Sequence, residues 1–441
     1  MRFVYRLAVT LTTALLASCG SSGSSLTSLT PPSHATQLHR SIYYVVQNLG
    51  SFGGTGCCLV VTNNDRGWVD GTSNLPGDKN FHPFVWRGHG LKDLGTLGGP
   101  NASVGGMNDR GDVTVGGADT GKPDPLGEDF CGFGTHQICL SFIWRNGKRT
   151  LIPTLGGNNN DVNTVNNRGL VLAVAETAVH ATCRSPQVLK YQGFTWELET
   201  HKIHRLLPLK GDEISEAFNM NERGDAVGYS GICGAGEGDI YAQNHAALWR
   251  DGKPIDLGSL GGTIANAATG INDRDQISGT SALHGDTTAH AFMWERGAMK
   301  DLGTLPGDHL SFAGNINAAG DVPMQSCKSV AVPKCRAALW QDGVITDLNT
   351  LVHQRSSLFL IGASWVNDHG DIVGTALDRA TGAQVPFLAT RCDPDAALPD
   401  ACTQAAHDLQ IIGTRRDMTL PETSDRRIRA LRLSALERSA L

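Results

Sequence analysis

Short runs of alternating apolar and polar residues fill most of the chain, and residues typical of tight turns separate them. In the best-preserved stretch four such runs follow one another, at Ala268–Asn272, Gln276–Thr280, Ala289–Trp294 and Met299–Leu305. A period of two is typical of β-strands with one buried face. No helical periodicity continues through these runs, so the pattern predicts an all-β protein built from short strands.

A turn motif divides these runs into units. An Asn is followed three residues later by Gly in most copies, as in N-D-R-G, and Asp275 replaces the Gly in one copy. Asn at the first position of a type I turn bonds to the backbone, and Gly at the fourth position adopts a positive φ. The motif begins at Asn64, Asn108, Asn166, Asn221, Asn272, Asn317 and Asn367. Its spacing of 44 to 58 residues predicts seven repeats joined by loops of variable length.

An aromatic strand and a D-L-G-T-L-G-G segment follow the turn in most repeats. The strand ends at Trp86, Trp144, Trp196, Trp249, Trp294 and Trp340, and at Ala389 in the last repeat. Tryptophans exposed in a site can stack on ligands, but the same strand position in six repeats favours packing between neighbouring sheets. We expect these six tryptophans to form the structural core of the repeats.

The two ends of the repeat array complement each other. Tyr43–Phe52 resembles a fourth strand without a preceding hairpin, and the last repeat stops after its third strand, Val385–Thr390. Pairing these two strands completes seven four-stranded sheets and removes two exposed edges. We therefore predict a seven-bladed β-propeller over residues 43–392, closed by the N-terminal strand in the last blade. A β-solenoid is the alternative.

The repeat resembles the HAF-repeat family of extracellular bacterial proteins, whose name-giving triplet is intact at His290-Ala291-Phe292. The resemblance covers about residues 43–392, and Asp275 and Ala389 depart from the pattern. It implies an extracellular repeat protein. The family has no settled activity to transfer, so the resemblance bears on architecture more than on function.

The N-terminus predicts export. Arg2 and Arg6 precede an apolar run that is too short to span a bilayer, as in a signal peptide over residues 1–18. Leu16-Ala17-Ser18-Cys19 resembles the lipobox of bacterial lipoproteins, which implies acylation of Cys19, for example with palmitate, and membrane anchoring. Gly20 after the cysteine implies sorting to the outer membrane. Residues 19–42 then form a Ser- and Gly-rich flexible tether. An ordinary signal peptide is the alternative.

Ten cysteines remain beside Cys19, an even number for an oxidising compartment. We expect three local disulfides, Cys131–Cys139, Cys327–Cys335 and Cys392–Cys402, in preference to a zinc site. Cys183 and Cys233 occupy matching loops and are candidates for a further pair. The pairing of Cys57 and Cys58 stays open.

Repeated polar residues offer candidates for metal binding, but a structural role explains them better. His82, His245 and His290 each stand two residues before the middle of the aromatic strand. Because this position recurs, we expect structural hydrogen bonds rather than a metal site. The repeated Asp93, Asp256 and Asp301 are expected to cap turns rather than bind calcium. These patterns predict no metal, cofactor or catalytic residue. The net charge of −6 gives no reason to expect nucleic-acid binding.

The least repeated segments join the second and third strands of four repeats, and they should lie on one face of the ring. They are residues 119–139, 176–193, 231–245 and 323–336. Loops on a rigid scaffold are common places for function. We therefore expect a monomeric envelope protein that binds a protein or glycan partner through these loops. The alternative is a propeller enzyme, a lyase or hydrolase of an extracellular polymer.

The C-terminal tail, residues 393–441, has a different composition. Within it, residues 424–441 have a capping serine and apolar residues at helical spacing. This pattern predicts a short helix at the end of the chain.

Overall fold

The computed structural model describes residues 42–55, 59–181, 187–232, 243–329, 334–353, 356–393 and 402–403. Almost all regular elements in these ranges are β-strands, joined by a short 3-10 helix, η1 (Leu348–Thr350). The expected all-β class is therefore confirmed. The signal peptide, the tether over residues 19–42 and the predicted helix over residues 424–441 lie outside the described residues.

The strands form antiparallel groups of four, each following chain order. The first group is β2 (Leu59–Asn63), β3 (Val69–Asn74), β4 (Phe81–Trp86) and β5 (Leu91–Asp93). The second is β6 (Ala102–Met107), β7 (Val113–Pro123), β8 (Gln137–Arg145) and β9 (Lys148–Leu151). The third is β10 (Gly156–Val165), β11 (Leu170–His180), β12 (Leu189–Glu197) and β13 (Ile203–Leu206). The fourth is β14 (Ile214–Met220), β15 (Ala226–Gly231), β16 (Asn244–Arg250) and β17 (Lys253–Asp256).

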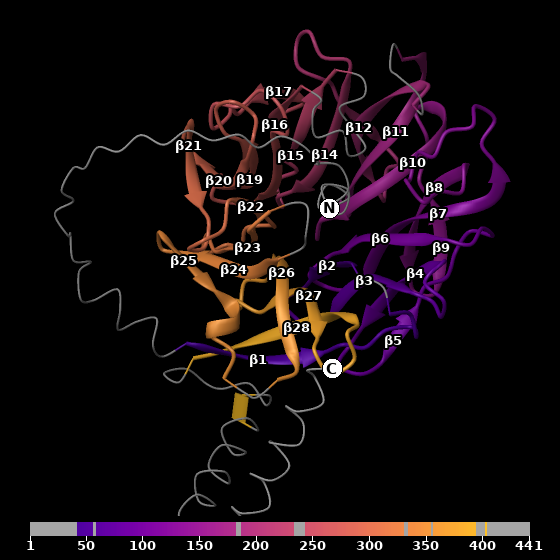
Figure 1. Cartoon of the computed structure of the whole chain (residues 1–441). Coiled ribbons are helices and arrows are strands. Elements are labelled where there is room, and N and C mark those ends of the chain that lie inside the picture. The colour runs from indigo at the N-terminus through magenta and orange to yellow at the C-terminus, as the bar shows by residue number, and fades with distance from the viewer. Residues whose placement is uncertain are drawn as a thin grey trace, which may run out of the picture.

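The fifth group is β18 (Ala267–Ile271), β19 (Ile277–Ala282), β20 (Ala289–Glu295) and β21 (Ala298–Gly303). The sixth is β22 (Leu310–Ala313), β23 (Val322–Cys327), β24 (Cys335–Gln341) and β25 (Val344–Asp347). The seventh is β26 (Leu358–Val366), β27 (Ile372–Asp378) and β28 (Gln384–Cys392), with β1 (Tyr43–Asn48) beside β28. One parallel pair, Gln192 with Ser215, links the third and fourth groups. Figure 1 shows the groups around a common centre, with the first strand of each group innermost.

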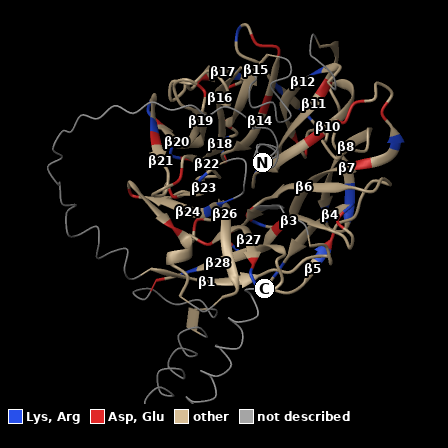
Figure 2. Cartoon of the chain, in the orientation of Figure 1, with Lys and Arg blue, Asp and Glu red and all other residues tan. Residues whose placement is uncertain are grey.

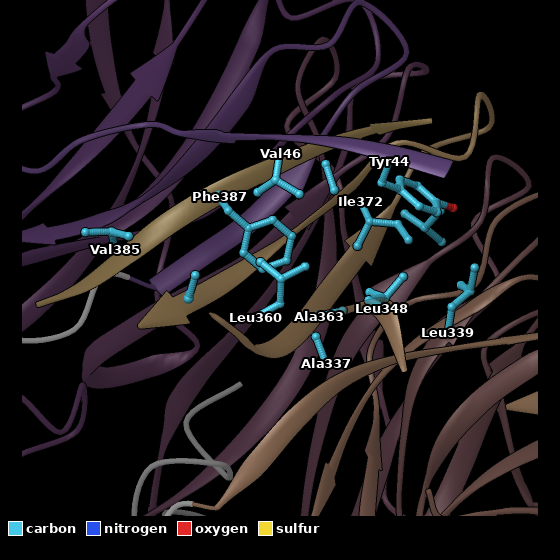
Figure 3. Packing of buried hydrophobic residues seen from close by; sticks show 13 residues of the cluster. Tyr44, Val46, Ala337, Leu339, Leu348, Leu360, Ala363, Ile372, Val385 and Phe387 are labelled. Atoms are coloured by element: carbon cyan, nitrogen blue, oxygen red, sulfur yellow. The ribbon is translucent and has the colours of Figure 1, made fainter. Parts of the chain in front are cut away.

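The strand nearest the N-terminus completes the last group. β1 pairs antiparallel with β28, with Tyr43 opposite Cys392 and Asn48 opposite Phe387. Tyr44 and Val46 of β1 are buried in one hydrophobic cluster with Phe387 (Figure 3). The two strands that the sequence pairs are therefore neighbours, although β1 ends at Asn48 rather than Phe52.

The turn asparagines connect neighbouring groups. In the first, third, fourth, fifth and seventh turns the Asn Oδ1 accepts the N–H groups of the residues two and four positions later, for example Arg223 and Asp225 on Asn221. The Asn Nδ2 donates to the backbone carbonyl of the corresponding Asn of the next group. These bonds run from Asn64 to Asn108, Asn166 to Asn221, Asn221 to Asn272, Asn272 to Asn317, Asn317 to Asn367 and Asn367 to Asn64. We call these seven residues the asparagine series.

The turn of Asn108 differs from the others of the asparagine series. The backbone N–H of Asn108 donates to Val113, five residues later, whereas that of Asn221 donates to Asp225, four residues later. The Asn108 Nδ2 donates to Asp112 Oδ1 at 2.7 Å. Asn167 bonds to Asp109 instead and joins the second group to the third.

Asp275 shows how the turn tolerates a residue other than Gly. It adopts a φ of 64°, in the left-handed region that the turn requires. Its carboxylate lies 2.7 Å from the Arg250 guanidinium and also pairs with Arg223. These ion pairs hold the side chain that this backbone conformation exposes.

The tryptophans pack against the preceding group, as expected, but they are not uniformly buried. Trp86, Trp196 and Trp249 are buried. Trp144, Trp294 and Trp340 are half-buried and pack against hydrophobic clusters. Lysine side chains lie over two of these rings: Lys92 Nζ is 4.4 Å from the centre of the Trp144 ring, and Lys300 Nζ is 5.2 Å from that of Trp340.

Trp249→Ala should lower the free energy of unfolding by about 3–5 kcal/mol, because it removes a fully buried ring and its Nε1–H bond to the Leu207 carbonyl. Trp144→Ala should cost clearly less, because one side of Trp144 lines an open pocket. Urea denaturation of both variants measures the difference. Equal losses would contradict the assigned burial.

Candidate functional site

The repeated histidines take part in structural hydrogen bonds. His82 Nδ1 lies 2.8 Å from Asp93 Oδ2, and His290 Nδ1 lies 2.9 Å from Asp301 Oδ2. Each pair joins the third and fourth strands of one group. His245 bonds to Asp212 instead, at 3.2 Å.

The aspartates of D-L-G-T-L-G-G cap turns. In each of them, Oδ1 accepts the N–H of the Gly two residues later, at 2.6 Å for Asp93, 2.8 Å for Asp256 and 2.7 Å for Asp301. The described residues hold no group of three or more His, Cys, Asp or Glu side chains that could bind a metal ion. No helix in the described part of the chain is long and apolar enough to cross a membrane.

The connections between second and third strands lie at the end of each group opposite the asparagine turns, since consecutive strands are antiparallel. We call this end the loop face. Strands occupy more of the predicted loops than expected, so the irregular part of residues 119–139 is only 124–136. The loops over 176–193, 231–245 and 323–336 lie partly outside the described residues.

Three disulfides are present at the cysteine pairs that the spacing predicts: Cys131–Cys139, Cys327–Cys335 and Cys392–Cys402. The first two clip loops of the loop face, and the third attaches residue 402 to the end of β28. Cys19, Cys57, Cys58, Cys183 and Cys233 lie outside the described residues.

Residues 124–136 form a compact loop, which we call the β7–β8 loop. Asp124 Oδ1 accepts the N–H groups of Leu126 and Glu128, and Asp129 accepts the N–H of Gly134. Because these bonds and the Cys131–Cys139 disulfide fix the loop internally, it presents a preformed surface.

The β7–β8 loop reaches over the neighbouring groups. Phe130 and Cys131 are buried in a hydrophobic cluster with Tyr191 of β12 and Tyr229 of β15. The Phe130 and Tyr191 rings meet edge to face, with centroids 6.2 Å apart. One loop of the second group is therefore packed against the third and fourth groups.

A hydrogen-bonded chain continues from this cluster to the innermost strand of the fourth group. The hydroxyls of Tyr191 and Tyr229 are 2.9 Å apart, and the Tyr229 hydroxyl donates to Glu216 Oε2 at 3.0 Å. Burial, together with the charges of Tyr191 and Glu216, raises the pKa of Tyr229 well above its usual range. Tyr229 is therefore a neutral donor at physiological pH.

Two glutamates are buried where the β7–β8 loop meets the third group: Glu128 of the loop and Glu176 of β11. Glu128 Oε1 accepts the Leu189 N–H at 2.9 Å, and Glu176 Oε2 accepts both the backbone and side-chain N–H of Asn159 at 3.1 Å. Burial, and then the charge of Glu128, raises the pKa of Glu176 to about 8. The two carboxyls thus fasten the loop to the third group, with Glu176 protonated at neutral pH.

Sequence reasoning missed this pair of glutamates. Neither belongs to a repeated motif, and their proximity depends on how the β7–β8 loop folds. One signal in the sequence could have pointed to Glu176. At the end of the second strand, the second and third repeats have an acidic residue, Asp119 and Glu176, where the next two repeats have Gly231 and Ala282.

Acidic and basic side chains are interspersed along the strands of the described part (Figure 2). The chain carries 43 acidic and 37 basic residues.

No protein-family model matches the chain, and no curated protein matches it. Among solved structures, the β-propeller domain of the Trilobed protease from Pyrococcus furiosus is 9% identical, with a TM-score of 0.46, over 78% of this chain and 95% of that domain. An acylaminoacyl peptidase from Pyrococcus horikoshii is 9% identical, with a TM-score of 0.45, over 74% of this chain and 50% of its own.

A gluconolactonase from Xanthomonas campestris is 10% identical, with a TM-score of 0.38, over 80% of this chain and 92% of its own. This chain spans about half the length of the peptidase. At these identities and TM-scores we take no activity from the similar proteins, and the function proposed below rests on the residues of this chain.

Glu176→Gln should flatten the dependence of stability on pH. A carboxyl whose pKa is raised by folding stabilises the protein below its unfolded pKa, and this contribution is lost as pH rises through the folded pKa. The free energy of unfolding of the wild type should therefore fall between about pH 4.5 and pH 8. The variant, which is neutral at that position, should lose this decline in urea titrations across the range.

The matched control is Glu199→Gln, since the Glu199 side chain is 81% exposed. It should retain the wild-type profile. A Glu176→Gln profile that overlays the wild type would contradict the assigned protonation.

Proposed function

We propose that the seven groups of four strands are the blades of a closed β-propeller. Three contacts between the ends of the array support this. β1 pairs with β28, Asn367 donates to the Asn64 carbonyl at 3.1 Å, and Trp86 packs in one cluster with Val373 and Leu388. The other five tryptophans at this strand position each pack against the preceding group, and Trp86 of the first group packs against the last.

We further propose that the mature chain is a lipoprotein of the outer membrane, anchored by acylation of Cys19. The lipobox-like Leu16-Ala17-Ser18-Cys19 supports the anchor. The three disulfides support an oxidising compartment outside the cytoplasm.

The propeller would act as a binding module that engages a protein partner through its loop face. The observation that carries this proposal is the position of three exposed apolar side chains. Leu126, Val179 and Ile232, exposed by 40%, 57% and 44%, lie at the loop face of three successive groups: Leu126 in the β7–β8 loop, Val179 near the end of β11 and Ile232 directly after β15. Because burial of apolar side chains drives protein association, a partner that covers these loops would gain affinity from them.

The repeated polar residues also favour the loop face as the binding surface. His82, His290 and the asparagine series have internal hydrogen-bond partners, so the scaffold occupies them. What distinguishes one group from another is concentrated on the loop face.

The first arm of the test concerns the anchor. Cells that produce the full-length chain should incorporate labelled palmitate into it and retain it in the membrane fraction, and Cys19→Ser should abolish both. Labelling of Cys19→Ser at the wild-type level would contradict the proposed anchor.

The second arm concerns the loop face and uses the chemically cross-linked, purified complex from the same cells. Aspartate at Leu126, Val179 and Ile232 together should reduce recovery of the partner about tenfold or more. The matched control places aspartate at Leu151, Ile203 and Val344, exposed by 52%, 36% and 40% on the fourth strands of their groups. Equal recovery with the two triple variants would contradict binding through the loop face.

A further inference from the structure

The fourth group departs from its siblings at one histidine. His82, His245 and His290 occupy equivalent positions, two residues before the residue that lies opposite the D-L-G aspartate. In the first and fifth groups the histidine bonds to that aspartate. In the fourth group His245 Nδ1 is 3.2 Å from Asp212 Oδ2 instead, and Asp256 is left without the imidazole.

Asp212 holds the His245 ring in place. It lies in the loop before β14, its side chain is only 7% exposed, and its Oδ2 also accepts the Ser230 hydroxyl at 2.6 Å. A buried carboxylate on Nδ1 fixes the orientation of the ring and leaves Nε2 for another partner. The His245 side chain is 49% exposed, so that partner can come from outside the fold.

A cavity of about 340 Å³ lies beside His245, between the start of β16, the end of β17 and the loop that leads to β18. Its lining consists of glycines and polar residues, including Gln243, Asp256 and Ser259. Most ligand pockets are lined mainly by hydrophobic and aromatic side chains, so these polar side chains favour a ligand with several hydrogen-bonding groups.

Some polar atoms of the lining are hydrogen-bonded within the fold, and others can still bond to a ligand. The Thr263 hydroxyl donates to Asp286, and the Asn266 amide bonds to Asn244. Asp256 Oδ1 accepts the Gly258 N–H, but its Oδ2 has no partner among the described residues. The Ser259 hydroxyl accepts the Gly261 N–H and keeps its own hydrogen to donate.

These groups distinguish between ligand classes. The Asp256 carboxylate disfavours phosphate and carboxylate ligands, and the lining contains no Lys or Arg to offset it. No set of His, Cys, Asp and Glu side chains in the described chain suits a metal ion. A carboxylate acceptor, an imidazole Nε2 and a hydroxyl donor match the alternating donors and acceptors of neighbouring sugar hydroxyls.

We propose that this cavity binds a single neutral sugar unit, with Asp256 Oδ2 accepting from its hydroxyls and His245 Nε2 and Ser259 bonding to its oxygens. The sugar site lies on the loop face but uses none of the three apolar residues invoked above. The proposed sugar site can therefore be tested separately from the proposed protein partner.

The test titrates the full-length chain, purified in detergent, with glucose, galactose and N-acetylglucosamine. Saturation-transfer NMR detects the bound sugar, and ¹³C-labelled histidine reports on the His245 imidazole. At least one sugar should show saturable binding and shift the His245 resonance. Asp256→Asn should weaken its binding about tenfold or more, the loss expected for a hydrogen bond to a charged group.

Asp93→Asn is the matched control, because Asp93 holds the same position but is paired with His82. It should bind the sugar with wild-type affinity. Absence of saturable binding by all three sugars would overturn the proposal, and so would equal losses in the two variants. Neither result would change the recovery of a protein partner through Leu126, Val179 and Ile232.

Discussion

One side chain, the asparagine that opens each turn between first and second strands, serves two purposes at once. Its Oδ1 caps the N–H groups of its own turn, and its Nδ2 reaches the backbone carbonyl of the equivalent residue in the next group. Because the bonds are buried, leaving either group unpaired would cost about 1–3 kcal/mol. The asparagine therefore sets both the local turn and the spacing between sheets.

This constraint separates the two ends of the molecule. The end with the asparagine turns is occupied by bonds that repeat from group to group, so little there can vary without disturbing the scaffold. The loop face carries the departures, namely the disulfide-clipped β7–β8 loop, the buried Glu128 and Glu176, and the displaced His245. Proposals about function belong on that face, because its side chains differ from group to group.

The repeated features were predictable from sequence because each rests on a local rule. Turn geometry follows from Asn and Gly, strand order follows from alternation, and the bonds of His82 and His290 follow from their recurrence. The details that failed depend on packing between distant segments. Trp144 keeps one side exposed in an open pocket that Lys92 of the preceding group also lines, and the approach of Glu176 to Glu128 depends on the path of a loop with no repeat to guide it.

We propose that the chain returns on itself, so that β1 completes the group that β26 begins. The Val45→Cys, Thr390→Cys double variant tests this directly, because the two residues are opposite each other in the β1–β28 pair and both are half-buried. After oxidation and proteolysis, mass spectrometry should find a disulfide between the peptides that contain positions 45 and 390. Free thiols at both positions in the folded, oxidised protein would contradict the account.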